Sequence, residues 1–212
     1  YNIVYMKNKL IFIDFDNTLL NGETTDYMNI DDLSDITNRA MSGEIDYYNS
    51  LLDKTKTMKG FNLNNIAPII DKLKYNLYAK EFIEWCHNNN YYVIVLSGGF
   101  DFILEHAQKE LNYDIFFCNY LRENNNILTG EINGPIMETN SKGIYVKKFQ
   151  RMFNIDKKMC ISIGDGANVM SMFKETEYSF SFCGKKIVCE NATYHINKPD
   201  FKLVKDIIEK NI

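Results

Sequence analysis

Ile11-Phe12-Ile13-Asp14-Phe15-Asp16-Asn17-Thr18-Leu19-Leu20 is the stretch of this chain that decides its predicted fold. The apolar run from Leu10 to Ile13 is typical of a buried strand in a parallel sheet. Two carboxylates one residue apart, Asp14 and Asp16, follow this strand directly. Acids so close together repel each other unless a cation or a proton lies between them. Taken alone, the pair fits a solvated turn as well as it fits a functional site.

Length and composition indicate an ordinary globular protein. The chain has 212 residues, of which 45% are hydrophobic and 25% charged, so it can form one domain or a core with a small inserted domain. The formal net charge of −4 argues against a nucleic-acid or anionic-membrane partner. Tyr91–Leu96, the longest apolar run, is too short to cross a bilayer, and no signal-peptide pattern opens the sequence.

The cysteines and histidines suggest neither a disulfide framework nor a zinc site. The five cysteines are odd in number and widely spaced, and most lie within apolar strings, which is typical of reduced, buried thiols. The three histidines show no ligand spacing. We therefore predict a cytoplasmic protein.

The hydrophobic pattern predicts strands that alternate with helices. Residues 24–76 show only helical periodicity, so we expect a helical insertion after the first strand. Its predicted apolar faces include Leu33, Ile36 and Ala40, and then Tyr47, Tyr48, Leu51 and Leu52. Beyond it, predicted strands alternate with predicted helices, and residues 124–135 suggest a hairpin or flap. The predicted strands cover 91–96, 113–118, 159–163, 178–182 and 192–196, and the predicted helices include 79–86, 103–111, 141–153, 168–174 and 200–210.

This alternation predicts an α/β fold with a doubly wound parallel sheet and right-handed crossovers. We expect residues 6–20 and 77–212 to form the core and residues 21–76 to form the inserted unit. In such sheets ligands bind beyond the carboxyl ends of the strands. Three predicted strands end in polar or glycine-rich chemistry, at Asp14-Phe15-Asp16, Ser97-Gly98-Gly99 and Gly164-Asp165-Gly166.

Together the three strand ends have the parts of a phosphoryl-transfer site. Asp14, Asp16 and Asp165 offer the hard oxygen ligands that suit Mg²⁺. The Ser97 hydroxyl and the peptide N–H groups of Gly98 and Gly99 precede a helix and favour an anion such as phosphate. Lys142, at the start of another predicted helix, can neutralise a charge there.

Two carboxylates can divide the work of phosphate-ester hydrolysis between them. One acts as nucleophile and forms an aspartyl-phosphate. The other protonates the leaving oxygen and then activates the water that hydrolyses the intermediate. Ser97-Gly98-Gly99 alone and Gly164-Asp165-Gly166 alone are each more often a plain turn, and Lys142 alone is more often a solvated helix lysine. Their joint occurrence at strand ends and helix starts favours the functional reading.

Four segments resemble the signature motifs of the haloacid dehalogenase superfamily phosphatases, and most of all the phosphoserine phosphatases. They are Asp14-Phe15-Asp16-Asn17-Thr18-Leu19, Ser97-Gly98-Gly99-Phe100, Lys142 and Gly164-Asp165-Gly166-Ala167-Asn168. The resemblance covers nearly the whole chain, and its first two motifs are highly specific. It implies a Rossmann-like haloacid dehalogenase core with a small helical cap. It also implies Mg²⁺-dependent hydrolysis of O-phosphoserine to serine and phosphate, as in serine biosynthesis.

The same resemblance implies a role for each matching residue. Asp14 is expected to be the nucleophile and a Mg²⁺ ligand, and Asp16 the general acid/base that also gives Mg²⁺ its backbone carbonyl. Asp165 is expected to be the third metal ligand. Glu23 matches the glutamate that meets the substrate ammonium. The expected phosphate-site residues are Ser97, Gly98, Gly99, Lys142 and Asn168. Met41 and Tyr47 match cap residues that close over the substrate, although simple cap packing explains them equally well.

Two departures from the family pattern bear on activity. The last motif usually continues with an aspartate, but here it reads Asn168-Val169-Met170. Loss of such a supporting acid typically weakens metal binding or activity by about 10–100-fold. The family also binds the substrate carboxylate with a cap arginine. This chain has no arginine between Arg39 and Arg122, and Lys54 takes the expected place, where it cannot form the two-pronged arginine contact.

These departures leave two alternatives open. The missing arginine favours a related phosphatase or phosphotransferase with another small phosphorylated substrate. Val169 favours a degenerate member that binds a phosphorylated ligand without turnover. An acyl-enzyme hydrolase based on Ser97 is disfavoured, because no histidine is placed to activate the hydroxyl. The sequence makes no prediction of oligomeric state.

Overall fold

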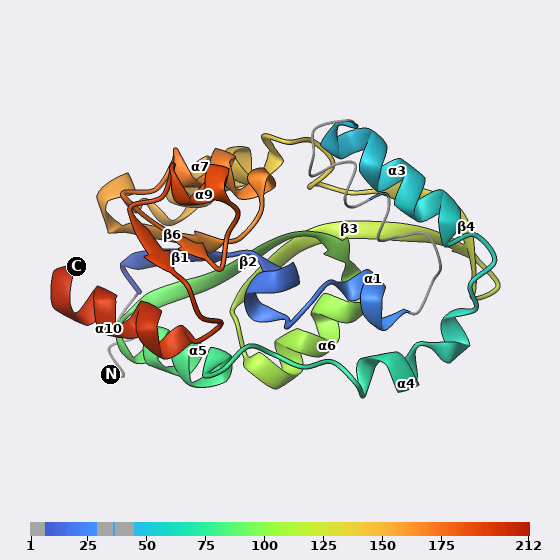
Figure 1. Ribbon diagram of the computed structural model, residues 1–212, viewed down its shortest axis with the longest axis horizontal. Coiled ribbons are helices and arrows are strands. Elements are labelled where there is room, and N and C mark those ends of the chain that lie inside the picture. The colour runs from blue at the N-terminus through green and yellow to red at the C-terminus, as the bar shows by residue number, and fades with distance from the viewer. Residues whose placement is uncertain (1–6, 29–35, 37–44) are drawn as a thin grey trace.

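The computed structural model describes residues 7–28, 36 and 45–212. These residues form a central twisted sheet with helices around it (Figure 1). Within these residues seven strands form one sheet in the order β4-β3-β2-β1-β5-β6-β7. Neighbouring strands are parallel except for β4, which runs antiparallel to β3. This confirms the predicted α/β fold with a doubly wound sheet. The strands are β1 Lys9–Ile13, β2 Tyr91–Phe100, β3 Ile115–Asn124, β4 Ile127–Asn133, β5 Cys160–Gly164, β6 Tyr178–Phe182 and β7 Tyr194–Ile196.

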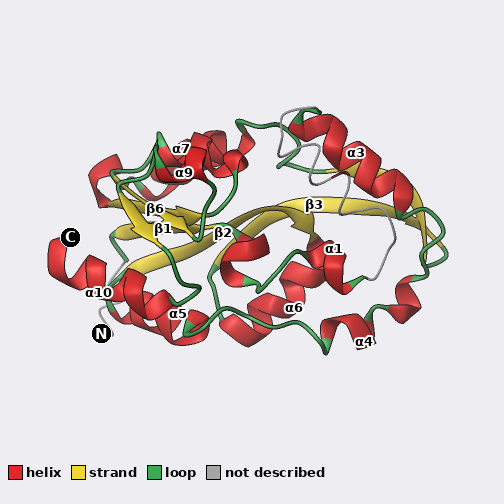
Figure 2. Ribbon diagram, in the orientation of Figure 1, coloured by secondary structure: helices red, strands yellow, loops and turns green. Residues whose placement is uncertain are grey.

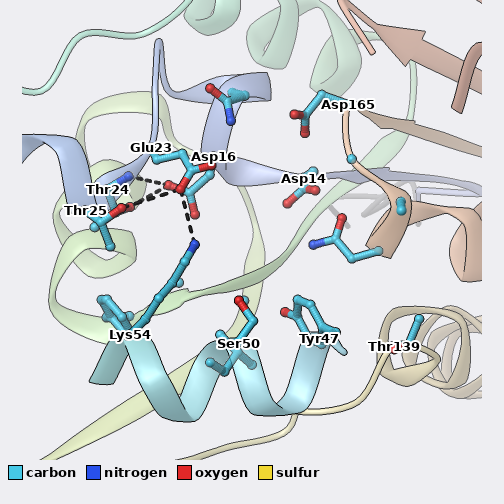
Figure 3. A pocket seen from close by; sticks show the side chains of 18 of the residues that line it. Asp14, Asp16, Glu23, Thr24, Thr25, Tyr47, Ser50, Lys54, Thr139 and Asp165 are labelled. Atoms are coloured by element: carbon cyan, nitrogen blue, oxygen red, sulfur yellow. Dashed lines mark hydrogen bonds and ion pairs between the residues drawn. The ribbon is translucent and has the colours of Figure 1, made fainter. Parts of the chain in front are cut away.

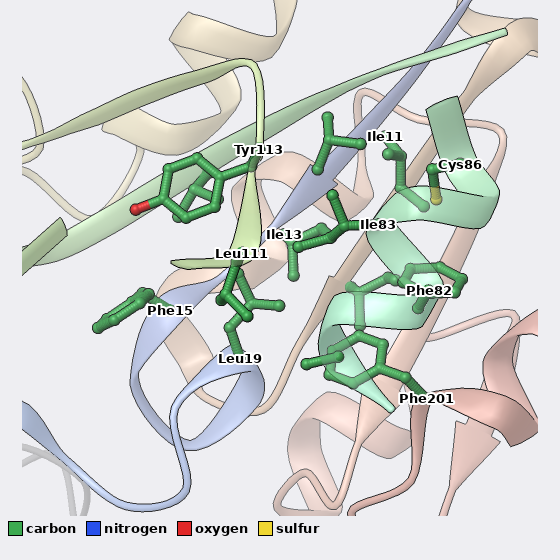
Figure 4. Packing of buried hydrophobic residues seen from close by; sticks show 14 of the residues in the cluster. Ile11, Ile13, Phe15, Leu19, Phe82, Ile83, Cys86, Leu111, Tyr113 and Phe201 are labelled. Atoms are coloured by element: carbon green, nitrogen blue, oxygen red, sulfur yellow. The ribbon is translucent and has the colours of Figure 1, made fainter. Parts of the chain in front are cut away.

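Helices cover both faces of the sheet (Figure 2). On one face lie α5 (Ala79–Asn88), α6 (Asp101–Leu111) and α10 (Phe201–Asn211), and on the other lie α7 (Ser141–Phe153), α8 (Met170–Phe173) and α9 (Lys186–Cys189). Strand β1 contributes to both hydrophobic clusters, because alternate side chains of a strand point to opposite faces. Ile11 and Ile13 pack on the first face beside Phe82 and Phe201, as Figure 4 shows, whereas Phe12 packs on the second.

The predicted elements agree with the structure in most places, with two corrections. Ser97-Gly98-Gly99 is not a turn, because β2 stays extended to Phe100. Its pairing with β3 shifts register between Leu96 and Phe100, so the strand continues past a bulge. The four-residue helix α9 was not predicted, since one helical turn is too short to show a periodic pattern.

Residues 21–76, which we call the cap, leave and re-enter the core at one place. The Asn21 N–H donates to the Lys74 carbonyl at 2.7 Å, and the Asn76 N–H donates to the Leu19 carbonyl at 2.9 Å. The described part of the cap contains α1 (Thr24–Tyr27), α3 (Tyr47–Thr57), a 3₁₀ turn (Leu63–Asn65) and α4 (Ala67–Ile70). The expected apolar face through Leu33 and Ala40, and Met41, lie outside the described residues. The domain boundaries remain predictions.

The cap rests on the β3–β4 hairpin that the sequence predicted as a flap. Helix α3 packs against β4, and Met28 and Met58 of the cap share an apolar cluster with Phe100 and Leu128. The hairpin therefore supports the cap from the core side. No helix of the described residues is long and apolar enough to cross a membrane.

Candidate active site

The strand order brings the predicted site residues to one edge of the sheet. Strand β1 lies between β2 and β5, so the carboxyl ends that carry Asp14, Ser97 and Asp165 are neighbours. Helix α3 of the cap lies opposite these ends, across a cavity of about 430 Å³ (Figure 3). Of the residues predicted for the site, the cavity is lined by Asp14, Asp16, Glu23, Lys54, Gly98, Gly99, Asp165 and Asn168. Ser97 and Lys142 are buried behind this lining.

Asp14 is held between a backbone donor and a buried cation. Its Oδ1 accepts a 2.7 Å hydrogen bond from the Phe15 N–H, and its Oδ2 lies 2.6 Å from Lys142 Nζ. The side chains of Lys142 and Asp14 are only 1% and 6% exposed. Lys142 comes from the first turn of α7. This turn packs so closely on Ser171 that a β-carbon on Gly143 would collide with the Ser171 carbonyl, so the neighbouring residue must be glycine. The expectation that Lys142 neutralises a charge here agrees with this contact.

Asp16 turns away from Asp14 toward the start of the cap. Its Oδ1 accepts hydrogen bonds from the Thr24 N–H at 2.6 Å and from the Thr24 hydroxyl at 2.7 Å. The left-handed backbone of Asn17, at φ 54°, makes the sharp turn that allows this. Burial raises the pKa of Asp16 to about 6, and the negative charge of Glu23 adds to the rise while the Thr24 hydrogen bonds oppose it. The carboxyl can therefore hold or release a proton near neutral pH.

The bulged end of β2 presents its glycines to the cavity. The Gly99 N–H donates to the Ser97 hydroxyl at 2.9 Å. A β-carbon on Gly98 would collide with the hydroxyl of Tyr47, which reaches it from α3. A side chain at position 98 would therefore displace the Tyr47 hydroxyl from its place against the backbone.

The loop after β5 brings a third carboxylate to the site. The Thr18 hydroxyl donates to Asp165 Oδ1 at 3.4 Å. Burial raises the pKa of Asp165 to about 7, the charge of Asp14 adds to the rise, and the charge of Lys142 opposes it. Figure 3 shows Asp14 and Asp165 facing the same space. Two carboxylates with hard oxygen donors, one buried and one half-buried, fit a divalent cation.

No group of three or more His, Cys, Asp or Glu side chains is arranged as a metal site within the described residues. The carboxylate of Asp16 is engaged by Thr24. The expectation that Asp16 offers only its backbone carbonyl to a metal is compatible with this geometry. Val169 is fully buried in the apolar cluster under α7 and packs against Gly164.

Glu23 and Lys54 form an ion pair across the mouth of the cavity. Lys54 Nζ lies 3.3 Å from Glu23 Oε2, and the two side chains are 17% and 22% exposed. Glu23 precedes α1 and Lys54 lies on α3, so the pair joins two parts of the cap (Figure 3). The two residues predicted to meet opposite charges of a substrate therefore meet each other here.

Sequence reasoning missed some of the residues that line the site. It grouped Tyr47, Tyr48, Leu51 and Leu52 on one face of α3, but Tyr48 is 40% exposed and is not among the residues that line the cavity. The face toward the cavity is Tyr47, Ser50, Leu51 and Lys54, at helical spacing i, i+3, i+4 and i+7. Starting this period from Lys54 would have identified Ser50. Thr24 and Thr139 carried no signal of this kind.

Comparison with known proteins agrees with this geometry. Residues 11–173 match the family model described as haloacid dehalogenase-like hydrolase. The phosphoserine phosphatase of Campylobacter jejuni subsp. doylei is 34% identical over 94% of this chain and 99% of its own, and that of Methanocaldococcus jannaschii is 33% identical over 92% and 95%. A solved phospho-aspartyl intermediate analogue of phosphoserine phosphatase matches with a TM-score of 0.89 at 32% identity, covering 96% of this chain and 99% of that one. The chain therefore belongs to the haloacid dehalogenase-like hydrolases, in the branch of the phosphoserine phosphatases.

Proposed function

We propose that this protein hydrolyses O-phosphoserine to serine and phosphate through an aspartyl-phosphate on Asp14. The observation that carries the proposal is the Asp14 carboxylate, fixed by the Phe15 N–H and Lys142 in the wall of a cavity that charged residues of the cap also line. Relatives of this chain are named phosphoserine phosphatases, and a similar solved structure is a substrate-bound phosphoserine phosphatase complex.

Two carboxyl groups carry the chemistry in this mechanism. An oxygen of Asp14 attacks phosphorus, and the bond from phosphorus to the serine oxygen breaks. Asp16 gives its proton to the departing oxygen, for which its pKa of about 6 is suited. Asp16 then takes a proton from a water, the water oxygen attacks phosphorus, and Asp14 is released with inorganic phosphate. Ser97, Gly98, Gly99, Lys142 and Asn168 hold the phosphoryl oxygens and the growing charge.

The family implies a divalent metal, and we propose Mg²⁺. The carboxylates of Asp14 and Asp165 and the backbone carbonyl of Asp16 would hold it, because these hard oxygens suit the ion. When bound, the ion screens the negative charges of the nucleophile and the phosphate from each other. Such a partner would favour the charged form of Asp165, whose pKa is raised by burial and by the charge of Asp14.

Val169→Asp is expected to raise Mg²⁺ affinity by about 10-fold or more. The change restores an acid in the loop after β5 that carries the proposed metal ligand Asp165. Val169 is fully buried against Gly164, close to Asp14, so the new carboxylate also lowers stability in chelator. Calorimetric titration with Mg²⁺ measures the affinity directly. The matched control is Val169→Asn, which has the same shape without the charge. Equal Mg²⁺ affinity in all three proteins would contradict the argument.

The Glu23–Lys54 pair supports a zwitterionic amino-acid substrate. The ammonium and carboxylate groups of phosphoserine can each take one partner of the pair, so that neither charge is left alone in a half-buried site. Glu23 would bind the ammonium and Lys54 the carboxylate. The phosphate then points toward Asp14, on the other side of the cavity.

Lys54→Arg is expected to lower the KM for O-phosphoserine roughly three- to tenfold, since arginine can grip a carboxylate with two parallel hydrogen bonds. O-phosphoethanolamine, which lacks only the carboxylate, should show an unchanged KM. Lys56→Arg serves as the control, because Lys56 is exposed on the same helix and pairs with Asp53. An equal improvement for both substrates would place Lys54 away from the carboxylate.

Phosphate release from O-phosphoserine, O-phosphoethanolamine and 3-phosphoglycerate, with Mg²⁺ and with chelator, tests the proposal. We expect turnover of O-phosphoserine that disappears with chelator. Turnover of another ester in its place would favour a related phosphatase with a different small substrate. Failure to release phosphate from any of them would favour the non-catalytic binding role that Val169 suggests.

We also propose a cytoplasmic location. All five cysteines are free, and Cys86, Cys118 and Cys160 are buried, which suits a reducing compartment. The proposed partner is the small phosphorylated substrate.

A further inference from the structure

Tyr47 places a hydroxyl from the cap among the loops of the catalytic core. Its side chain rises from the first turn of α3 toward the strand ends that carry Asp14 and Asp165 (Figure 3). The hydroxyl lies against the backbone of Gly98, hydrogen-bonds the side chain of Asn168 and donates to the Ile136 carbonyl at 3.3 Å. Gly98 and Asn168 are two of the residues proposed to hold phosphate, so the hydroxyl stands beside the phosphate subsite.

The contact with Ile136 does not require this hydroxyl. The Ile136 carbonyl already accepts a 3.0 Å hydrogen bond from the amide of Asn119, and the Ile136 N–H donates back to Asn119 at 3.0 Å. Asn119 is fully buried and also donates to the Gly98 carbonyl at 3.2 Å. It therefore holds the backbone at Ile136 and the backbone at Gly98 in place without help from Tyr47. The longer bond from Tyr47 is a second and weaker one, and its proton can turn to a better acceptor.

A phosphoryl group is such an acceptor. Hydrogen bonds to a charged oxygen are shorter and roughly twice as strong as those between neutral groups. Burial and the nearby charges of Asp14 and Asp16 raise the pKa of Tyr47, so the phenol keeps its proton. Asp14 and Asp16 are the proposed nucleophile and acid/base, and both line the same cavity as Tyr47.

We propose that the Tyr47 hydroxyl donates a hydrogen bond to a non-bridging oxygen of the transferring phosphoryl group. This rests on the proposed function. The core alone then supplies an incomplete set of phosphate donors, and the cap completes it when α3 lies over the site. Coupling a donor to the cap also favours reaction in the closed, water-poor cavity.

Tyr47→Phe tests the proposal, because it removes the hydroxyl and keeps the ring. We expect kcat/KM for O-phosphoserine to fall roughly 10- to 100-fold. The inhibition constant of orthovanadate, which resembles the transferring phosphoryl group, should rise by a similar factor. Inhibition by L-serine, which has no phosphate, should not change. Tyr48→Phe is the matched control, since it removes a phenol hydroxyl from the adjacent, exposed position, and it should behave as wild type.

Two results would overturn the inference while the proposed function stands. One is a Tyr47→Phe protein whose kcat/KM lies within twofold of the wild-type value. The other is a loss of activity with unchanged orthovanadate inhibition, which would show that the hydroxyl only holds the cap in place. If the wild-type protein itself releases no phosphate from O-phosphoserine, the proposed function fails and the inference falls with it.

Discussion

Asp14→Asn should lower phosphate release by on the order of 10⁴-fold or more, because a residue that forms the covalent bond has no substitute in the site. Asparagine has the same size, and its amide oxygen can still accept the hydrogen bond from the Phe15 N–H, but its NH2 group then faces the Lys142 ammonium where Asp14 Oδ2 had been. Lys142 loses the counter-charge of Asp14, so some unfolding free energy should be lost. It stays close enough to Asp165 to oppose the rise in the pKa of that carboxyl, so the fold should persist. The loss of activity is expected in kcat, and substrate binding should be retained.

Single-turnover measurements with O-phosphoserine check this result, and acid-trapped phosphoprotein should appear in the wild type alone. Mass spectrometry of the Asp14→Asn protein guards against deamidation, which would restore the aspartate. Asp156→Asn is a suitable control, since Asp156 caps a surface turn through a hydrogen bond from the Lys158 N–H. Activity of Asp14→Asn within tenfold of wild type would mean that the nucleophile lies elsewhere.

Lys142→Met should remove both activity and stability, because it leaves the Asp14 carboxylate buried without its cation. Breaking a buried ion pair by removing one partner typically costs about 3–5 kcal/mol of unfolding free energy. The loss of a positive charge beside the phosphoryl group should lower kcat/KM by roughly 10³-fold. Urea unfolding in the presence of chelator measures the stability, since no added metal ion can then replace the lysine charge.

A double variant separates the two effects of Lys142. In Asp14→Asn/Lys142→Met both charges are gone, so most of the lost stability should return while activity stays absent. Lys158→Met, at an exposed lysine, should change unfolding free energy by less than about 0.5 kcal/mol. Two results would contradict this prediction: a Lys142→Met protein as stable as the wild type, or a double variant that is the least stable of the set. Either would show that the cost of Lys142→Met does not come from leaving the Asp14 charge buried and unpaired.

The elements that the sequence predicts best are those whose pattern is complete within one segment. Helix α7 and strand β6 have the predicted bounds, because each shows its full hydrophobic period over its own length. The error at Ser97-Gly98-Gly99 has the opposite cause. Two glycines after a strand usually mark a turn, yet pairing of Phe100 with Asn119 on β3 keeps this segment extended. That pairing comes from a distant part of the chain.

The burial of Lys142 is another feature of the site that local sequence does not predict. A lysine in the first turn of a helix is usually solvated, and only its place in the four motifs marked it as functional. In the structure it is buried, because α7 packs Gly143 against Ser171 and points the lysine at Asp14. Nothing in the local sequence around Lys142 encodes that burial.

The sequence by itself determined the α/β fold, the helical insertion and the three strand ends whose chemistry meets at one edge of the sheet. Periodicity and short motifs are local properties, and the topology of parallel strands then brings their carboxyl ends together. Only the tertiary structure decided which side chains meet in the site. Asp14 pairs with Lys142 and Glu23 with Lys54, Asp16 accepts hydrogen bonds from Thr24, and Tyr47 lies against Gly98 and donates to the Ile136 carbonyl. Apart from Asp16 and Thr24, which are eight residues apart, these pairs join residues far apart in the chain, and their distances depend on how the cap and α7 pack against the sheet.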